Sequence, residues 1–189
     1  MKKAGFIGEG ESEVIILNSS NFQELLKRFN IDCVGVFNAE GINNLIKRNE
    51  RITSYFEIFK DRNADKVFML GDLDFERCII ERKNSFYKYE ENQIVIISVR
   101  AIEAWYLADS ITLSSIFKMN YFYPNPENTN ELPFEVLKKE FVNKRGRGIG
   151  PSKVRLSNYI VRNGFSIENA IKHENCKCVR YFFNKLTTN

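Results

Sequence analysis

Acidic residues stand directly after two stretches that are typical of buried strands. Glu9 follows residues 3–8, and Asp72 and Asp74 follow residues 66–71. In an open parallel sheet, ligands bind just beyond the carboxyl ends of the strands, where loops from different strands converge. Residues two apart on an extended segment point to the same side, so we expect Asp72 and Asp74 to present their carboxylates together. If the two strands are neighbours, Glu9 joins them in one carboxylate cluster.

Three ionised carboxylates within a few ångström repel one another, so such a cluster implies a divalent cation. Mg²⁺, or Mn²⁺ in its place, is a hard ion that takes oxygen ligands and is shared with substrate phosphates. A cation on Asp72 and Asp74 would orient a phosphodiester and stabilise its developing charge, with Glu9 as the candidate acid or base. An Asp-x-Asp pattern is weak by itself, because Asp72 could equally cap the next helix.

The elements that must position these acids indicate an α/β fold. Short β-rich runs alternate with helical patterns, which predicts parallel βαβ units. Strands are expected at residues 3–8, 33–37, 66–71 and 93–99. Helices are expected from a cap at Ser12 to Phe29, and at residues 42–62, 75–89 and 101–109. The predicted fold is therefore a mainly parallel, Rossmann-like sheet of four strands flanked by helices.

The C-terminal part of the chain reads as a helical extension. Residues 121–133 contain three of the four prolines and are expected to form a loop. Helices are expected at residues 135–143, 152–163 and 178–186, with a basic, glycine-rich turn at residues 144–151. We therefore predict an α/β core over residues 1–112 and a basic helical extension, packed on the core, over residues 113–189.

The two acidic motifs together resemble a known domain. Gly8-Glu9-Gly10-x-Ser12-Glu13, then a βα unit, then Gly71-Asp72-Leu73-Asp74, is similar to the TOPRIM domain of topoisomerases, primases and OLD-type nucleases. In that family the glutamate after the first strand handles protons and the Asp-x-Asp binds Mg²⁺. The resemblance therefore implies these roles for Glu9, Asp72 and Asp74.

A third motif narrows the resemblance. Glu103-Ala-Trp105-Tyr-Leu-Ala108-Asp109 looks like the E-x-W-x-x-A-D helix of a small, stand-alone TOPRIM-like family linked with mobile-element and antiviral loci. The resemblance covers roughly the first 110 residues and departs from the family at Glu11, where such loops often carry proline or a small polar residue. The sequence lacks the residues that surround the catalytic tyrosine of a topoisomerase, and it lacks the zinc ribbon of a primase. These absences argue against both activities and favour the nuclease-like branch of the family.

Two further acids are secondary candidates for metal ligands. Glu13 lies in the first turn of a predicted helix, where an acid also benefits from the helix dipole. Glu103 opens a helix after the fourth predicted strand and is either a ligand of a second metal or a helix-start carboxylate. Trp105 lies in an apolar stretch and is interpreted as a core residue rather than as a base-stacking platform.

Charge divides unevenly along the chain. The net charge of +4 is the sum of −4 over residues 1–143 and +8 over residues 144–189. Lysine and arginine supply most non-specific affinity for nucleic acid by neutralising phosphates, although a charge excess is also typical of a solvated helix face. The candidate phosphate contacts are Lys144, Arg145, Arg147, Lys153 and Arg155.

Cysteine and histidine are sparse. The single histidine excludes sites that need two imidazoles. His173, Cys176 and Cys178 offer three ligands where a structural zinc site needs four, so the cysteines are interpreted as packing residues. The scattered cysteines and the absence of an apolar run long enough to span a bilayer favour a cytoplasmic protein with no membrane association.

These observations favour a Mg²⁺- or Mn²⁺-dependent nuclease acting on DNA or RNA. The TOPRIM resemblance further implies a toxic effector in defence against phage or mobile elements, held by an ATPase partner. Cleavage of both strands of duplex DNA would require two sites and hence a homodimer. Two alternatives remain open: a catalytically silent subunit that binds nucleic acid or a protein partner, and a metal-dependent phosphohydrolase of a small phosphorylated metabolite.

Overall fold

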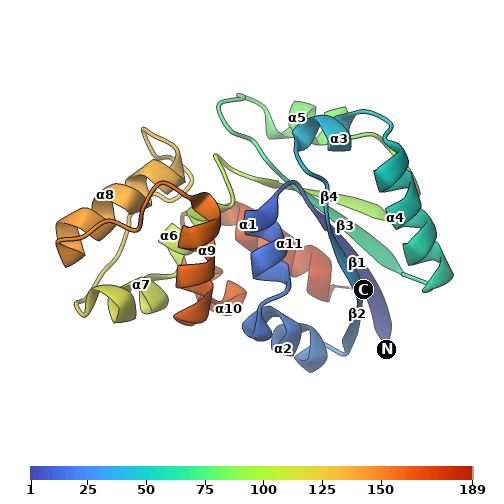
Figure 1. Ribbon diagram of the computed structural model, residues 1–189. Coiled ribbons are helices and arrows are strands. Elements are labelled where there is room, and N and C mark those ends of the chain that lie inside the picture. Colours follow the sequence, from blue (N-terminus) through green and yellow to red (C-terminus); the bar gives the residue numbers. More distant parts are fainter. Residues whose placement is uncertain (189) are drawn as a thin grey trace. The chain divides into compact units, whose positions relative to one another are not determined.

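Four parallel strands form the sheet of this protein. The computed structural model describes residues 1–188, and its strands are β1 (Lys2–Gly8), β2 (Ile31–Asn38), β3 (Lys66–Asp72) and β4 (Gln93–Ser98). Their spatial order is β2-β1-β3-β4 (Figure 1). The predicted α/β fold with a parallel four-stranded sheet is confirmed.

The strand order reverses direction between β1 and β3. The chain passes from β1 to β2 on one side and then returns across β1 to reach β3 on the other. Phe6 in β1 accordingly pairs with Val36 of β2 and with Phe68 of β3. In doubly wound sheets, the point of reversal opens a crevice at the carboxyl ends of the strands. Glu9 and Asp72 lie at the two strand ends that border this point.

Helices cover both faces of the sheet in the first unit. They are α1 (Glu11–Leu17), α2 (Ser20–Arg28), α3 (Ile42–Ile46), α4 (Glu50–Asp61) and α5 (Ile79–Ser85). Figure 1 shows α1 and α2 on one face and α4 on the other. The crossovers from β1 to β2 and from β2 to β3 run in opposite directions along the sheet. Right-handed crossovers of this kind place their helices on opposite faces, so this arrangement follows from the strand order.

Two of the long helices expected from the sequence are interrupted. The first begins after Gly10 rather than at Ser12, and it ends before Ser19, whose hydroxyl accepts from Phe22 N at 3.3 Å and caps α2. The helix expected at residues 42–62 is broken between α3 and α4, where the Asn49 side chain accepts from Arg51 N at 3.0 Å. Serine and asparagine provide caps that compete with helix continuation, and this accounts for both breaks.

The helix expected at residues 75–89 is much shorter in the structure. Only α5, Ile79–Ser85, is helical there. The residues after it bond elsewhere, because Tyr87 N donates to Leu45 O at 2.9 Å and Tyr89 N donates to the Gln93 side chain at 2.9 Å. Neither bond is a helical backbone bond, so the prediction of a longer helix is wrong.

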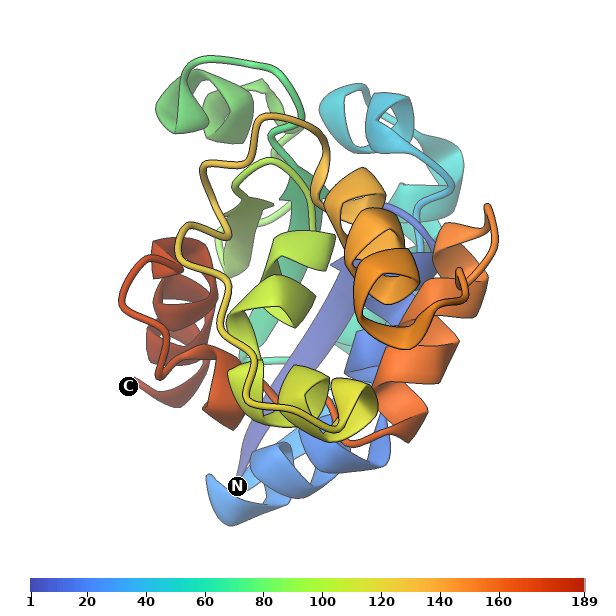
Figure 2. The ribbon, with the colours of Figure 1, turned by 90° about the vertical axis from the view of Figure 1, so that its left-hand side faces the viewer.

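The second compact unit consists of helices. The chain divides into Met1–Ile97 and Ser98–Asn189, and α6, which the sequence analysis grouped with the first 112 residues, belongs to the second unit. Its helices are α6 (Glu103–Ala108), α7 (Ser110–Phe117), α8 (Pro133–Arg145), α9 (Lys153–Arg162), α10 (Ile167–Ala170) and α11 (Lys177–Thr187). Helices α7 and α10 are not among those expected from the sequence. The predicted loop before α8 is present (Figure 2).

Aromatic side chains form the core of this second unit. Trp105 is fully buried and stacks on Phe182, with ring centroids 5.4 Å apart. Tyr106 meets Phe165 edge to face at 4.9 Å. The interpretation of Trp105 as a core residue is confirmed. Among residues 1–188, no helix is both long enough and apolar enough to cross a bilayer.

Candidate functional site

The side chain of Glu9 reaches across to the end of the neighbouring strand. Glu9 N donates to Leu70 O at 2.9 Å, which extends the backbone pairing of β1 and β3 by one residue. Glu9 Oε2 then accepts a hydrogen bond from Asp72 N at 2.9 Å. Two of the three predicted catalytic residues are therefore brought together at the reversal point of the sheet. Asp72 is 7% exposed, and Glu9 is half-buried.

Gly71 makes this contact possible. A Cβ atom at this position would lie 2.7 Å from Phe86 Cζ and 3.2 Å from Glu9 Oε2. Any side chain would therefore displace the carboxylate or the phenyl ring. Packing against Phe86 and Glu9 therefore requires a glycine at position 71.

Asp74 lies apart from the extended strand. β3 ends at Asp72, and Asp74 has a φ angle of 53°, in the left-handed region. The expectation that Asp72 and Asp74 share one extended segment is therefore wrong. A tight turn after Leu73 redirects the chain. Glu9, Asp72 and Asp74 do not form a group of three ligand atoms within 4.8 Å of one another in the part of the chain that the structure describes.

A buried arginine faces the carboxylate of Asp74. Arg82 Nη2 lies 3.9 Å from Asp74 Oδ2 and 3.1 Å from Glu76 Oε1, and the Arg82 side chain is 9% exposed. Arg82 is not among the site residues expected from the sequence. No local pattern could have revealed it, because Arg82 meets the turn only once α5 has folded back.

Glu13 has a structural role at the start of α1. Its Oε2 accepts from Gly10 N at 3.0 Å, which satisfies a backbone donor at the N-terminus of the helix. Glu13 is 3% exposed, and Gly8 allows the close approach because a Cβ there would lie 2.5 Å from Glu13 Cβ. Its predicted role as a metal ligand stays a prediction.

Glu103 is the first residue of α6 in the second unit and is fully buried. Lys153 Nζ lies 3.7 Å from Glu103 Oε2. The ammonium group balances the buried carboxylate, so this predicted metal ligand and this predicted phosphate contact form an ion pair. A second-metal role for Glu103 stays a prediction.

The remaining basic residues surround the turn between α8 and α9. Lys144, Arg147 and Arg155 are exposed. Arg145 is half-buried, donates from Nη1 to Tyr159 Oη at 2.6 Å, and lies 5.4 Å from the centre of that ring. Ser152 caps the start of α9, since its hydroxyl accepts from Arg155 N at 3.2 Å. The turn thus presents exposed cations beside one arginine that is packed on an aromatic ring.

Asp109, the last residue of the E-x-W-x-x-A-D motif, connects two helices of the second unit. Its Oδ1 accepts from Thr112 N at 2.9 Å, and its Oδ2 accepts from the Thr112 hydroxyl at 2.7 Å and from Ser166 N at 3.0 Å. Burial raises the pKa of Asp109, although these hydrogen bonds oppose the shift. In this structure the motif therefore supplies a cap and a core tryptophan.

Comparison of the chain with protein-family models, with curated proteins and with solved structures finds no match.

Proposed function

We propose that this protein is a Mg²⁺- or Mn²⁺-dependent phosphodiesterase that acts on nucleic acid at the carboxyl edge of its sheet. The observation that carries the proposal is the hydrogen bond between Glu9 Oε2 and Asp72 N at the reversal point between β1 and β3. This point is where open α/β sheets bind their ligands. The Glu9 side chain lies there against the backbone of Asp72, so acidic residues from two neighbouring strand ends are adjacent, and carboxylate oxygens are the ligands that a hard cation takes.

The two carboxylates can divide the work of hydrolysis. Asp72, at the end of β3, is the proposed metal ligand. A bound Mg²⁺ would polarise the phosphodiester and lower the pKa of an attacking water. We propose that the Glu9 carboxylate, whose Oε2 is held by Asp72 N, accepts the proton of the water as the water oxygen attacks phosphorus. The bond from phosphorus to the leaving oxygen then breaks, the leaving oxygen takes up a proton from solvent, and Glu9 returns the proton that it accepted to solvent.

Asp74 and Arg82 suggest how the charge of such a site would be balanced. The guanidinium near Asp74 partly offsets the negative charge of the turn, which would reduce the affinity of Asp74 itself for a cation. We therefore assign Asp74 an outer position and propose Asp72 as the metal ligand, with Glu9 as the base. Glu13 and Glu103 already have a cap and a lysine partner, so neither is needed as a ligand in this proposal.

The exposed cations between α8 and α9 support nucleic acid as the substrate class. Lys144, Arg147 and Arg155 present positive charge to solvent. Contacts of this kind fix a phosphate backbone without reading its sequence. A small phosphorylated metabolite would not need several exposed cations, and this favours the polymer.

The TOPRIM resemblance extends the proposal to a biological role. It suggests an effector of defence against phage or mobile elements that is restrained by an ATPase partner. Homodimerisation would be required for cleavage of both strands of a duplex. These extensions depend on the nuclease activity and are secondary to it.

The test is a cleavage assay with matched charge-removing variants. The full chain is incubated with Mg²⁺ or Mn²⁺ and plasmid, single-stranded DNA or total tRNA. Glu9→Gln and Asp72→Asn are expected to lower the cleavage rate by a factor of at least about 100, as loss of a general base or a metal ligand does. Glu11→Gln is the matched control, because Glu11 is exposed and its carboxylate accepts from the Asn38 side chain at 2.8 Å, which a glutamine oxygen can also do.

The outcomes distinguish the nuclease from the two alternative functions. Cleavage that is unaffected by Glu9→Gln and Asp72→Asn would overturn the site. Absence of cleavage, together with binding that weakens as salt rises, would support the silent binding subunit instead. Release of phosphate from small phosphomonoesters, with polymers untouched, would support the metabolite phosphohydrolase.

A further inference from the structure

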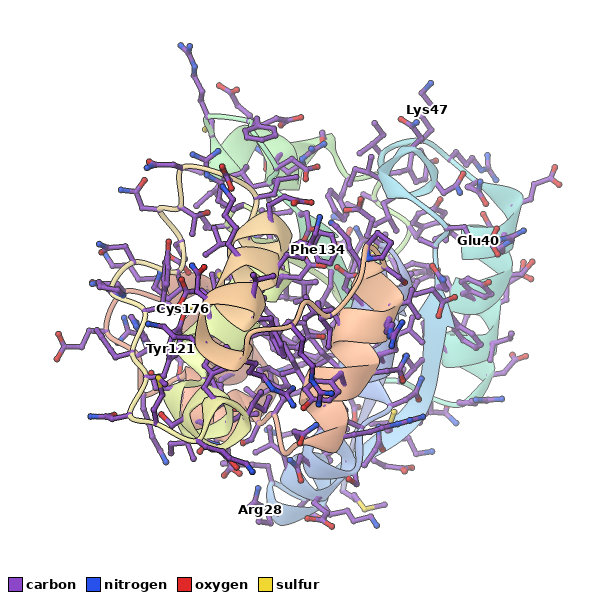
Figure 3. The ribbon with its side chains drawn as sticks, turned by 60° about the vertical axis from the view of Figure 1, so that its left-hand side comes forward. Arg28, Glu40, Lys47, Tyr121, Phe134 and Cys176 are labelled. Atoms are coloured by element: carbon purple, nitrogen blue, oxygen red, sulfur yellow. The ribbon has the colours of Figure 1, made fainter. Side chains whose placement is uncertain are left out.

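Two segments of the second unit, distant in sequence, meet at the start of α11. The loop that follows Tyr121 lies against residues 173–178, with Asn175 Nδ2 donating to Pro124 O at 2.8 Å (Figure 3, where Tyr121 and Cys176 are labelled). Further along the same loop, Glu127 Oε1 accepts from Cys178 N at 2.6 Å. The loop therefore delivers a carboxylate to two cysteines.

The ligand atoms of these three residues form a compact group. The sulfurs of Cys176 and Cys178 and a carboxylate oxygen of Glu127 all lie within 4.8 Å of one another. Three points so spaced have a common centre within about 2.8 Å of each, whereas zinc bonds are about 2.3 Å to sulfur and about 2.0–2.2 Å to a carboxylate oxygen. An ion at the centre would require inward movements of about 0.5 Å for the sulfurs and about 0.6–0.8 Å for the carboxylate oxygen.

We propose that Cys176, Cys178 and Glu127 form a binding site for a thiophilic divalent cation, Zn²⁺. The site is separate from the carboxylates of the sheet edge and does not depend on the proposed nuclease activity. Two thiolates favour zinc over magnesium, because sulfur is a soft ligand and Mg²⁺ takes oxygen. Three protein ligands leave a fourth, tetrahedral position for water.

His173 is not the third ligand, although it lies close in sequence. Its Nε2 lies 2.7 Å from Tyr123 O, and its Nδ1 accepts from Asn175 N at 3.1 Å. Both ring nitrogens are therefore engaged with the backbone. Sequence inspection alone pairs the cysteines with this histidine, whereas the folded loop supplies Glu127 instead.

The surroundings suit a negatively charged zinc-thiolate group. Trp105 Nε1 donates to Cys178 Sγ at 3.0 Å, and a donor of this kind stabilises a thiolate. Zn²⁺ with two thiolates and one carboxylate carries a net charge of −1. Cys176 is the N-cap of α11 and makes no side-chain cap hydrogen bond, so this charge would lie at the positive end of the helix dipole.

The ion would tie an irregular loop to a regular helix. The loop between α7 and α8 contains neither helix nor strand over residues 119–132. Glu127 is its ligand, and the two cysteines belong to the start of α11. Because an unfolded chain lacks the assembled site, binding of zinc would also stabilise the folded second unit.

The experiment titrates the reduced, metal-free full chain with Co²⁺ and then with Zn²⁺ in the absence of oxygen. We expect one equivalent of Co²⁺ to produce thiolate-to-cobalt absorption, and one equivalent of Zn²⁺ to abolish it. A variant with Cys33→Ser and Cys78→Ser should behave as the wild type, because those thiols belong to the first unit. Cys176→Ser should lose the signal. Glu127→Gln should weaken binding at least about tenfold, while its amide oxygen can still accept from Cys178 N.

A second measurement on the wild-type chain guards against variants that fail to fold. Zn²⁺ should protect Cys176 and Cys178 from alkylation, mapped by mass spectrometry, and leave Cys33 and Cys78 as reactive as before. The proposal is overturned if the wild type takes up no equivalent of metal or if Cys176→Ser binds it unchanged. It also fails if all four thiols are protected equally, or if Cys176 and Cys178 form a disulfide that persists under reducing conditions.

Discussion

Glu9 Oε2 and Asp72 N are joined by a hydrogen bond of 2.9 Å that crosses from the end of β1 to the end of β3. The bond fixes the orientation of the Glu9 side chain. Its donor is a backbone N–H group, which does not change its protonation state. One oxygen of Glu9 is thereby committed to the fold. The same residue can therefore be tested separately for its structural role and for its proposed chemical role.

Glu9→Ala should destabilise the fold more than Glu9→Gln. Alanine removes the acceptor and leaves Asp72 N unpaired beside a buried strand end, which costs about 1–3 kcal/mol. Glutamine keeps an oxygen that can accept from Asp72 N, so its free energy of unfolding should stay near that of the wild type. Urea unfolding followed by circular dichroism measures both changes. Equal losses for the two variants would show that the hydrogen bond does not matter.

Gly71→Ala should lower the free energy of unfolding by about 1–3 kcal/mol, because the added methyl overpacks the site. Its Cβ would lie 2.7 Å from Phe86 Cζ and 3.2 Å from Glu9 Oε2. Gly10→Ala is the matched control, since its nearest contact would be Glu13 Oε2 at 3.5 Å. Thermal unfolding of the two variants should separate them by several degrees. A more damaging Gly10→Ala would contradict this packing argument.

Asp109→Asn should destabilise the second unit although it preserves side-chain volume. Asp109 Oδ2 accepts from both the Thr112 hydroxyl and Ser166 N, and an amide nitrogen in its place cannot accept from Ser166 N. Leaving a buried donor unpaired costs about 1–3 kcal/mol. Hydrogen exchange of the Ser166 amide should accelerate in the variant. Unchanged exchange and stability would contradict the assignment of Asp109 as a connecting residue.

Arg147→Gln and Arg145→Gln should differ in what they impair. Arg147 is exposed, so its loss should weaken nucleic-acid binding and lower the slope of log affinity against log salt by about 1, without affecting stability. Arg145 donates to Tyr159 Oη at 2.6 Å and should mainly cost stability, about 1 kcal/mol. Binding measured across a salt series, beside urea unfolding, distinguishes the two. The interface proposal fails if Arg147→Gln leaves both affinity and salt slope unchanged.

The pH dependence of Cys33 alkylation should be shifted to higher pH in the folded protein. Burial raises the pKa of its thiol above the ordinary value of 9.0, although a hydrogen bond with Gln23 opposes the shift. A raised pKa means less thiolate at any pH below it, so the midpoint of the rate profile should lie above pH 9.0. The same site in urea-unfolded protein provides the control. A folded-state midpoint at or below that of the unfolded chain would contradict the effect of burial.

Much of the fold follows from local sequence alone. The four strands are short apolar runs whose position does not depend on distant residues, and all four occur where the sequence predicts them. The caps at Ser19 and Asn49 also depend on local sequence. They are not predicted, because the apolar residues on either side keep a helical spacing that indicates one continuous helix. In the E-x-W-x-x-A-D motif, the contacts of Trp105 with Cys178 and of Asp109 with Ser166 join residues far apart in sequence, so the motif alone does not reveal them.

The sequence by itself determined which residue types stand at each strand end, because strand runs and the acids that follow them are neighbours along the chain. Only the tertiary structure decided which of them meet. Glu9 and Asp72 are 63 residues apart in sequence and 2.9 Å apart in space, whereas Asp74, two residues further on, turns toward Arg82. Glu127 likewise reaches Cys178 across 51 residues. Such contacts result from strand order and from loop paths, and no local period in the sequence encodes either.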